Sequence, residues 1–240
     1  MESAETLAHG FGHPDTLVMA LGGAAWFHVL RREAQIALQR SEVAIALANQ
    51  HGFPYLALQT GIIQGWALAL AGHGRDGVAQ MEAELAARKA AGAVRPPAQF
   101  LAWLAEAYAK NGYLTKGLSV LEQALATVDR AGDALYEAEL YRLKGELFLM
   151  QESSKAREAE NCFRIAIEMS ARHGAKSLEL RAATSLARLL AKCQRAKEAQ
   201  ALLAKIYGWF TEGFDSTDLT EAKALLNELA SWRCCRPRVV

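Results

Sequence analysis

Two short motifs in this 240-residue chain contain residue types that bind nucleotides or metals in other proteins. Residues 72–77 match G-x-G-x-x-G, in which glycines let the backbone approach a pyrophosphate. A dinucleotide site needs a strand before that pattern, whereas residues 66–70 continue a helical segment. His9 and His13 have the i,i+4 spacing of metal ligands, but the glycines between them disfavour a helix. We therefore expect neither motif to bind its ligand.

The rest of the chain offers no motif for catalysis. It contains no G-x-x-x-x-G-K-[ST], no G-x-S-x-G and no H-E-x-x-H. Cyclase activity would need a pair of metal-binding carboxylates at a strand and the turn that follows it, and the chain also lacks such a pair. The isolated histidines lie mostly at predicted helix ends, where a positive charge suits the helix dipole: His28, His51, His73 and His173. We predict a chain that is not an enzyme and binds no cofactor and no metal.

Residues 53–72 form an uncharged stretch of twenty residues with a G-x-x-x-G motif at 61–65. Taken alone, this composition is typical of a membrane helix that dimerises. Pro54 and three polar side chains weigh against a membrane span. Gly65 also falls in phase with small residues elsewhere in the chain. We interpret the stretch as a central helix that is buried by its neighbours.

The charge balance excludes two further classes of function. Lys and Arg total 27 against 26 Asp and Glu, and they are spread along the chain. A nucleic-acid binder or a protein held on anionic lipid would need a basic face. None of the four cysteines forms a C-x-x-C pair, and no signal peptide opens the chain. We therefore expect a reduced cytoplasmic protein that contacts neither nucleic acid nor membrane directly.

Regularly spaced glycines indicate where the helices of this chain end. They stand at 52, 72, 92, 112 and 132, twenty residues apart. Glycine is common just after a helix end, where the backbone turns left-handed. Twenty residues thus correspond to one helix and one tight turn, and two such units make a helical hairpin. The richness in Ala and Leu likewise favours helices over strands.

A second pattern supports stacked hairpins with a period of 40–43 residues. The first helix of each predicted hairpin carries a small residue: Gly22, Gly65, Ala105, Gly145 and Ala187. Small residues follow on the second helices, at Ala34, Gly77, Gly117, Ala159 and Ala199. Large ones come four residues later, at Leu38, Met81, Leu121, Phe163 and Leu203. We expect the small residues to let two helices approach closely and the large one to fill the gap to the next hairpin. In the fourth hairpin the pattern shifts by two residues, which predicts a longer turn around Ser153 and Ser154.

The pattern resembles the tetratricopeptide repeat, with longer helices than the usual thirty-four-residue unit. The third hairpin fits it best, at Leu104, Ala105, Tyr108, Gly112, Gly117, Leu121 and Ala124. Residues 137–147, 177–183 and 207–215 look like the C-terminal solenoid of bacterial multidomain regulators. In those proteins a cyclase or DNA-binding domain and an ATPase module precede the solenoid. This resemblance runs from about His13 to Leu229 and implies association with a cyclase or ATPase.

The tetratricopeptide resemblance implies a concave groove lined by the first helices of the hairpins. It places nine polar residues toward that groove: Gln99, Glu106, Lys110, Glu139, Arg142, Glu146, Arg181, Arg188 and Lys192. Earlier hairpins would add mostly apolar side chains, at Met19, Trp26, Phe27, Gln59, Ile62 and Trp66. Such a groove would suit an extended peptide, a partner helix or another domain. Equally, these residues could be the polar lining that every solenoid needs.

We therefore predict an all-α, right-handed α-solenoid of about five hairpins and a terminal helix over 217–229. Residues 1–13 lead into the repeats at 14–230, and 231–240 form a tail. The predicted function is protein–protein or interdomain interaction in a bacterial signalling or transcriptional regulator. Two alternatives stay open, a sensor of a small ligand and a fragment of a cyclase that lacks its catalytic domain. The apolar first hairpin also predicts an upstream neighbour or self-association there.

Overall fold

The computed structural model describes residues 6–8, 10, 12–92, 96–128 and 134–231. All regular structure in this part of the chain is helical. The elements follow one another as α2 (Pro14–Leu30), α3 (Ala34–Gln50), α4 (Pro54–Leu70), α5 (Gly74–Ala90), α6 (Ala98–Lys110), α7 (Leu114–Thr127), α8 (Ala134–Gln151), η1 (Ser153–Lys155), α9 (Ala156–Arg172), α10 (Lys176–Lys192), α11 (Ala196–Tyr207) and α12 (Thr217–Ser231).

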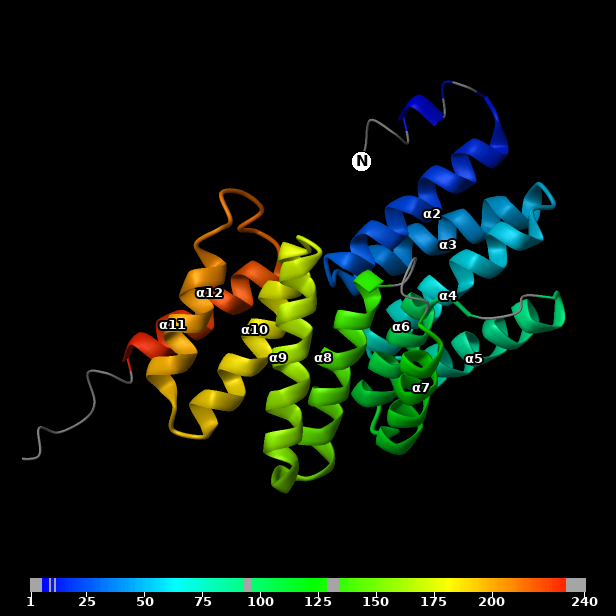
Figure 1. Ribbon diagram of the computed structural model, residues 1–240. Coiled ribbons are helices and arrows are strands. Elements are labelled where there is room, and N and C mark those ends of the chain that lie inside the picture. Colours follow the sequence, from blue (N-terminus) through cyan, green and yellow to red (C-terminus); the bar gives the residue numbers. More distant parts are fainter. Residues whose placement is uncertain (1–5, 9, 11, 93–95, 129–133, 232–240) are drawn as a thin grey trace, which may run out of the picture. The chain divides into compact units, whose positions relative to one another are not determined.

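The helices form consecutive antiparallel pairs, followed by the terminal helix α12 (Figure 1). The two helices pack together in four of these pairs, α2 with α3, α4 with α5, α8 with α9 and α10 with α11. The chain divides into two compact units, unit 1 up to Gly117 and unit 2 from Leu118. The all-α class and the helical hairpins predicted from the sequence are confirmed.

The hairpin turns repeat one hydrogen-bonding arrangement. Gly52, Gly72 and Gly112 have positive φ values of 72°, 106° and 79°. The amide of the next residue then donates to the carbonyl five residues back, as from Tyr113 to Tyr108 at 2.9 Å. This is a Schellman motif, which satisfies carbonyls at the helix end. The predicted role of these glycines is confirmed, while Gly132 lies outside the described residues.

Close contacts between small residues hold the second hairpin together. A Cβ at Gly65 would lie 2.6 Å from Met81 Cγ and 2.9 Å from the Gly77 carbonyl oxygen. A Cβ at Gly77 would collide with backbone atoms of Gly65 and Ala69. Only residues without a side chain allow α4 and α5 to approach this closely, so the predicted packing is confirmed here.

Phe163 lies against Gly145 of its own hairpin, where a Cβ would be 2.6 Å from its ring, and it also belongs to one core cluster with Leu180 and Leu186 of the next hairpin, as predicted. The packing differs from the prediction in one detail. Gly22 faces α4 instead of α3, with Thr60 Oγ1 3.2 Å from a Cβ there. The expected longer turn in the fourth hairpin is present, because η1 precedes α9.

The structure also tests the motifs that suggested other functions. Among the described residues, no helix is long and apolar enough to span a membrane. Residues 72–77 run from a helix end into the first turn of α5, so the strand of a dinucleotide site is missing. His73 precedes α5, where a positive charge does not suit the dipole of that helix. His9 lies outside the described residues, so its pairing with His13 stays untested.

Candidate protein-binding face

Three helices of unit 2 lie side by side and carry aligned polar stripes: α8 and α10, each the first helix of its hairpin, and the terminal helix α12. α8 packs against α10, and α10 packs against α12. On α10 the stripe consists of Arg181, Ser185, Arg188 and Lys192, which recur at helical spacing. The neighbouring stripes carry Glu139, Arg142 and Glu146 on α8 and Asp218 and Glu221 on α12. We call this surface the first-helix face of unit 2.

Charged side chains connect the three helices into one network. Arg142 donates to Glu139 through Nε and Nη2, at 2.9 and 2.8 Å. Arg181 bridges neighbouring helices, because Nη1 donates to Glu139 Oε1 at 3.2 Å and Nη2 donates to Asp218 Oδ2 at 2.7 Å. The guanidinium of Arg181 therefore connects α8, α10 and α12.

A second contact lies one turn along the same helices. Ser185 Oγ lies 2.5 Å from Glu146 Oε1 and donates to it. The same carboxylate lies 3.6 Å from Arg142 Nη1. Ser185 is therefore joined through Glu146 to the Arg142–Glu139 pair.

The network is largely removed from solvent. Glu139 is 7 % exposed and Arg142 is 8 % exposed. Burial by itself raises the pKa of Glu139, but the guanidinium groups of Arg142 and Arg181 outweigh it, so the pKa falls to about 2. Glu139 thus joins α8 to α10 through Arg181, and Arg142 pairs with two carboxylates of α8, so their charges are already neutralised within the protein.

Arg188 and Lys192 are the more accessible cations of this face. Arg188 is exposed and pairs with Glu221, with 2.8 Å between Nη2 and Oε2. Lys192 is exposed, and no ion pair of it occurs among the described residues. An exposed ion pair contributes little stability and exchanges easily for another partner. If a partner is recognised by charge here, these two side chains would make the contact.

The first helices of unit 1 are joined differently. α4 packs against both α2 and α6. The buried Trp66 on α4 donates from Nε1 to Glu106 Oε2 on α6, at 2.8 Å. Gln99 and Glu106 are half-buried on α6, and Lys110 is exposed at its end. Glu106, predicted to face a partner, therefore accepts a hydrogen bond inside the protein.

Aromatic and apolar side chains dominate the rest of this face. Trp26 on α2 and Trp103 on α6 meet edge to face, with ring centroids 6.2 Å apart. Met19 and Phe27 are exposed, whereas Ile62 and Trp66 are buried. Of the apolar residues predicted to line a groove, these last two serve the core instead. Whether either face binds a partner stays a prediction.

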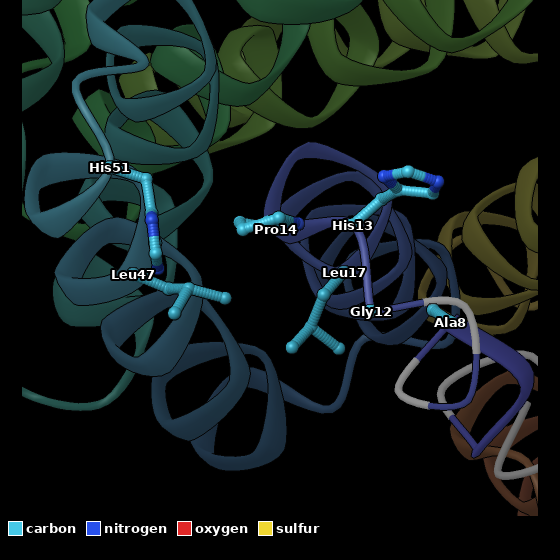
Figure 2. Close-up of a pocket in the computed structure, with 7 residues that line it drawn as sticks. All are labelled: Ala8, Gly12, His13, Pro14, Leu17, Leu47 and His51. Carbon is cyan, nitrogen blue, oxygen red and sulfur yellow. The ribbon is translucent and has the colours of Figure 1, made fainter.

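A small pocket lies elsewhere in unit 1, between the start of α2 and the end of α3. Pro14 and Leu17 lie opposite Leu47 and His51, and His13 and Ala8 complete the rim (Figure 2). Its volume is about 160 Å³. Among the described residues, no group of three or more His, Cys, Asp or Glu is arranged to hold a metal. His13 and His51 are the polar side chains of its lining, which is otherwise formed by apolar residues and Gly12.

Several participants in these contacts were not predicted from the sequence. Asp218 and Glu221 pair with Arg181 and Arg188, and Ser185 with Glu146. One signal was available: pairs that join neighbouring first helices lie 33 to 42 residues apart, close to one repeat. Trp209 is exposed in the turn after α11.

Comparison with known proteins gives structural matches only. No family model matches the chain, and no curated protein sequence does. A crystal structure of Bacillus thuringiensis PlcR in complex with the peptide PapR7 and DNA is similar, with 14% identity and a TM-score of 0.65, over 90% of this chain and 72% of that one. The tetratricopeptide-like repeats of a Podosopora anserina putative kinesin light chain match with 20% identity and a TM-score of 0.51, over 82% and 95%. BtubC from P. vanneervenii matches with 14% identity and a TM-score of 0.55, over 93% and 96%.

These similarities confirm the tetratricopeptide-like helical repeat fold. At such identities they show the fold alone, because a common fold serves many functions. None of them links the chain to cyclase or ATPase proteins.

Proposed function

We propose that this chain is a non-catalytic module that binds an extended peptide or a helix of a partner protein on its first-helix faces. The observation that carries the proposal is the side-by-side packing of first helices in each unit, which aligns their side-chain stripes. Arg188 and Lys192 leave exposed cations on the stripe of α10. The structural similarity to PlcR, crystallised with the peptide PapR7, is consistent with a peptide ligand.

The finer proposal is that the partner is a cyclase, ATPase or transcription factor of a bacterial signalling system. Its support is the resemblance at residues 137–147, 177–183 and 207–215. Under this proposal the chain regulates or positions the partner and performs no chemistry itself.

Peptide selection tests the proposal. A library of random peptides would be selected on the purified chain, and the affinity of a selected peptide would be measured by fluorescence polarisation. We expect the double variant Arg188→Glu and Lys192→Glu to weaken binding by about tenfold or more, because both cations lie on the proposed face.

The matched control reverses two exposed cations on second helices, Arg172→Glu on α9 and Lys197→Glu on α11. It should leave affinity within about twofold. Arg142 is unsuitable for this test, because Glu in its place would lie beside two carboxylates and cost stability. Equal losses in both double variants would reject the first-helix face as the binding surface.

A further inference from the structure

The first helix of unit 1 exposes an apolar stripe. On α2, Met19 is 63 % exposed, Phe27 40 % and Leu30 45 %. Their spacing, with Gly23 between them, places them on one side of the helix. No atom lies within 4 Å of the position that a Cβ on Gly23 would occupy. This side of α2 is therefore open and flat at its centre.

Later hairpins bury the equivalent position. One repeat after Met19 comes Ile62, and the next repeat has Ala102, and both are buried. A large exposed apolar residue at a position that the repeat otherwise covers is typical of an interaction surface. Exposed hydrophobic residues elsewhere in this hairpin differ in this respect. Val43 on α3, for example, occupies a position that is exposed in the next hairpin too, at Ala86.

We propose that two copies of the chain associate through α2, packed antiparallel against α2 of the second copy. The pattern is complementary to itself about Gly23, because Met19 precedes it by one turn and Phe27 follows it by one turn. A twofold axis beside Gly23 brings Met19 of each copy next to Phe27 and Leu30 of the other. Such a contact is isologous and closes at a dimer.

Two properties favour a second copy over an unrelated partner. Gly23 lacks a side chain, so the two helices can approach closely where they cross. Asp15 lies in the first turn of α2, and at its end lie Arg31, which pairs with Glu33 of the same chain, and Arg32. Antiparallel packing sets the acidic start of one helix near the basic end of the other and also opposes the two helix dipoles. This inference does not rest on the proposed peptide binding, but dimerisation would compete with a peptide on unit 1, because Met19 and Phe27 also lie on the first-helix face there.

Sedimentation velocity of the full chain across micromolar concentrations tests the proposal. We expect a monomer–dimer equilibrium, and Met19→Glu should raise the dissociation constant by about tenfold or more, because a charge would be buried at the contact. The matched control Val43→Glu replaces an equally exposed apolar residue on α3 and should leave the dissociation constant unchanged. A wild-type chain that stays monomeric, or equal effects of both variants, would overturn the proposal; the stripe would then be available to a different protein.

Two further variants separate assembly from folding. Gly23→Leu adds a side chain whose Cβ has no neighbouring atom within 4 Å in the monomer, so circular dichroism should show an intact helical fold while dimerisation weakens. A mixture of Met19→Glu with Phe27→Lys should form more heterodimer than either variant forms homodimer, because the new charges attract across the antiparallel contact. Failure of Gly23→Leu to weaken the dimer, or of the mixture to recover it, would contradict the antiparallel arrangement.

Discussion

The two units join neighbouring first helices with different chemistry. In unit 1 the contacts are an edge-to-face pair of tryptophans and an indole that donates to Glu106. In unit 2 a buried network of guanidinium and carboxylate groups crosses α8, α10 and α12. The burial of apolar rings is non-directional and tolerates small shifts, whereas a buried ion pair fails when one partner is lost. The same repeat geometry therefore accommodates two kinds of junction, with different responses to mutation, pH and salt.

The largest effect should come from removing the central carboxylate of unit 2. We expect Glu139→Gln to lower the free energy of unfolding by about 3–5 kcal/mol, because it leaves buried guanidinium groups of Arg142 and Arg181 without their shared partner. Chemical denaturation monitored by circular dichroism would measure it. The control Glu198→Gln removes a carboxylate from the exposed ion pairs with Arg164 and Arg195 and should cost below about 1 kcal/mol.

Acid should destabilise the two units differently. The pKa of Glu139 is about 2, below its ordinary 4.5, so its contribution is complete above about pH 4.5 and is lost as pH falls through about 2. The contribution is about 3 kcal/mol. Urea unfolding at pH 5 and at pH 2.5 should therefore show a fall in stability that is smaller in Glu139→Gln. An identical fall in both proteins would contradict the assignment.

A substitution in unit 1 tests how far its stability depends on close helix packing. Gly77→Ala places a methyl group against backbone atoms of Gly65 and Ala69, and we expect it to cost about 1–3 kcal/mol. Gly23→Ala is the control, because no atom of a neighbouring element of the same chain occupies that space; measured on dilute, monomeric protein, it should stabilise the chain by about 0.5–1 kcal/mol through helix propensity. Thermal unfolding would record both, and opposite signs are the expected result.

In unit 1 the hydrogen bond from the indole of Trp66 joins two first helices, as the ion pairs of Glu139 do in unit 2. Trp66→Phe removes the donor to Glu106 and part of a buried ring, and we expect a loss of about 1–3 kcal/mol. High salt should change this loss little, since no buried ion pair is broken. A strong dependence on salt in urea unfolding would show that unit 1 also relies on charge.

The smallest effect concerns a helix turn without glycine. Gln194 follows α10 with a φ of 62°, in the same Schellman arrangement that glycines form elsewhere. A left-handed residue with a side chain costs about 1–2 kcal/mol, so Gln194→Gly should stabilise the chain by up to about 1 kcal/mol. The measurement is again thermal unfolding, with Gly174→Gln, at φ 67°, as the reverse control.

Sequence reasoning succeeded where one residue type determines local geometry. Glycine at a left-handed turn and paired small residues such as Gly65 and Gly77 are visible as spacing, and they predicted the hairpins. Arg32 and Gln194 occupy equivalent turns without glycine, so residue type alone could not reveal them. At Arg32 and Gln194 the position of the turn is set by the length of the preceding helix.

The candidate face was harder to predict, because a charged residue at helical spacing looks the same whether it faces water or a buried partner. Arg142 and Arg188 both lie on the polar stripes of first helices. The first is buried beside Glu139, whereas the second is exposed. Which of them is available depends on the neighbouring helix, and the partners Asp218 and Glu221 lie on a terminal helix that the repeat pattern does not include.

Hydrogen–deuterium exchange of the full chain, with and without a peptide selected on it, would show which helices the peptide covers. We expect slower exchange on the first helices, above all on α10 around Arg188 and Lys192, while α9 and α11 stay unchanged. Protection confined to the second helices α9 and α11 would contradict the assignment of the first-helix faces as the binding surface.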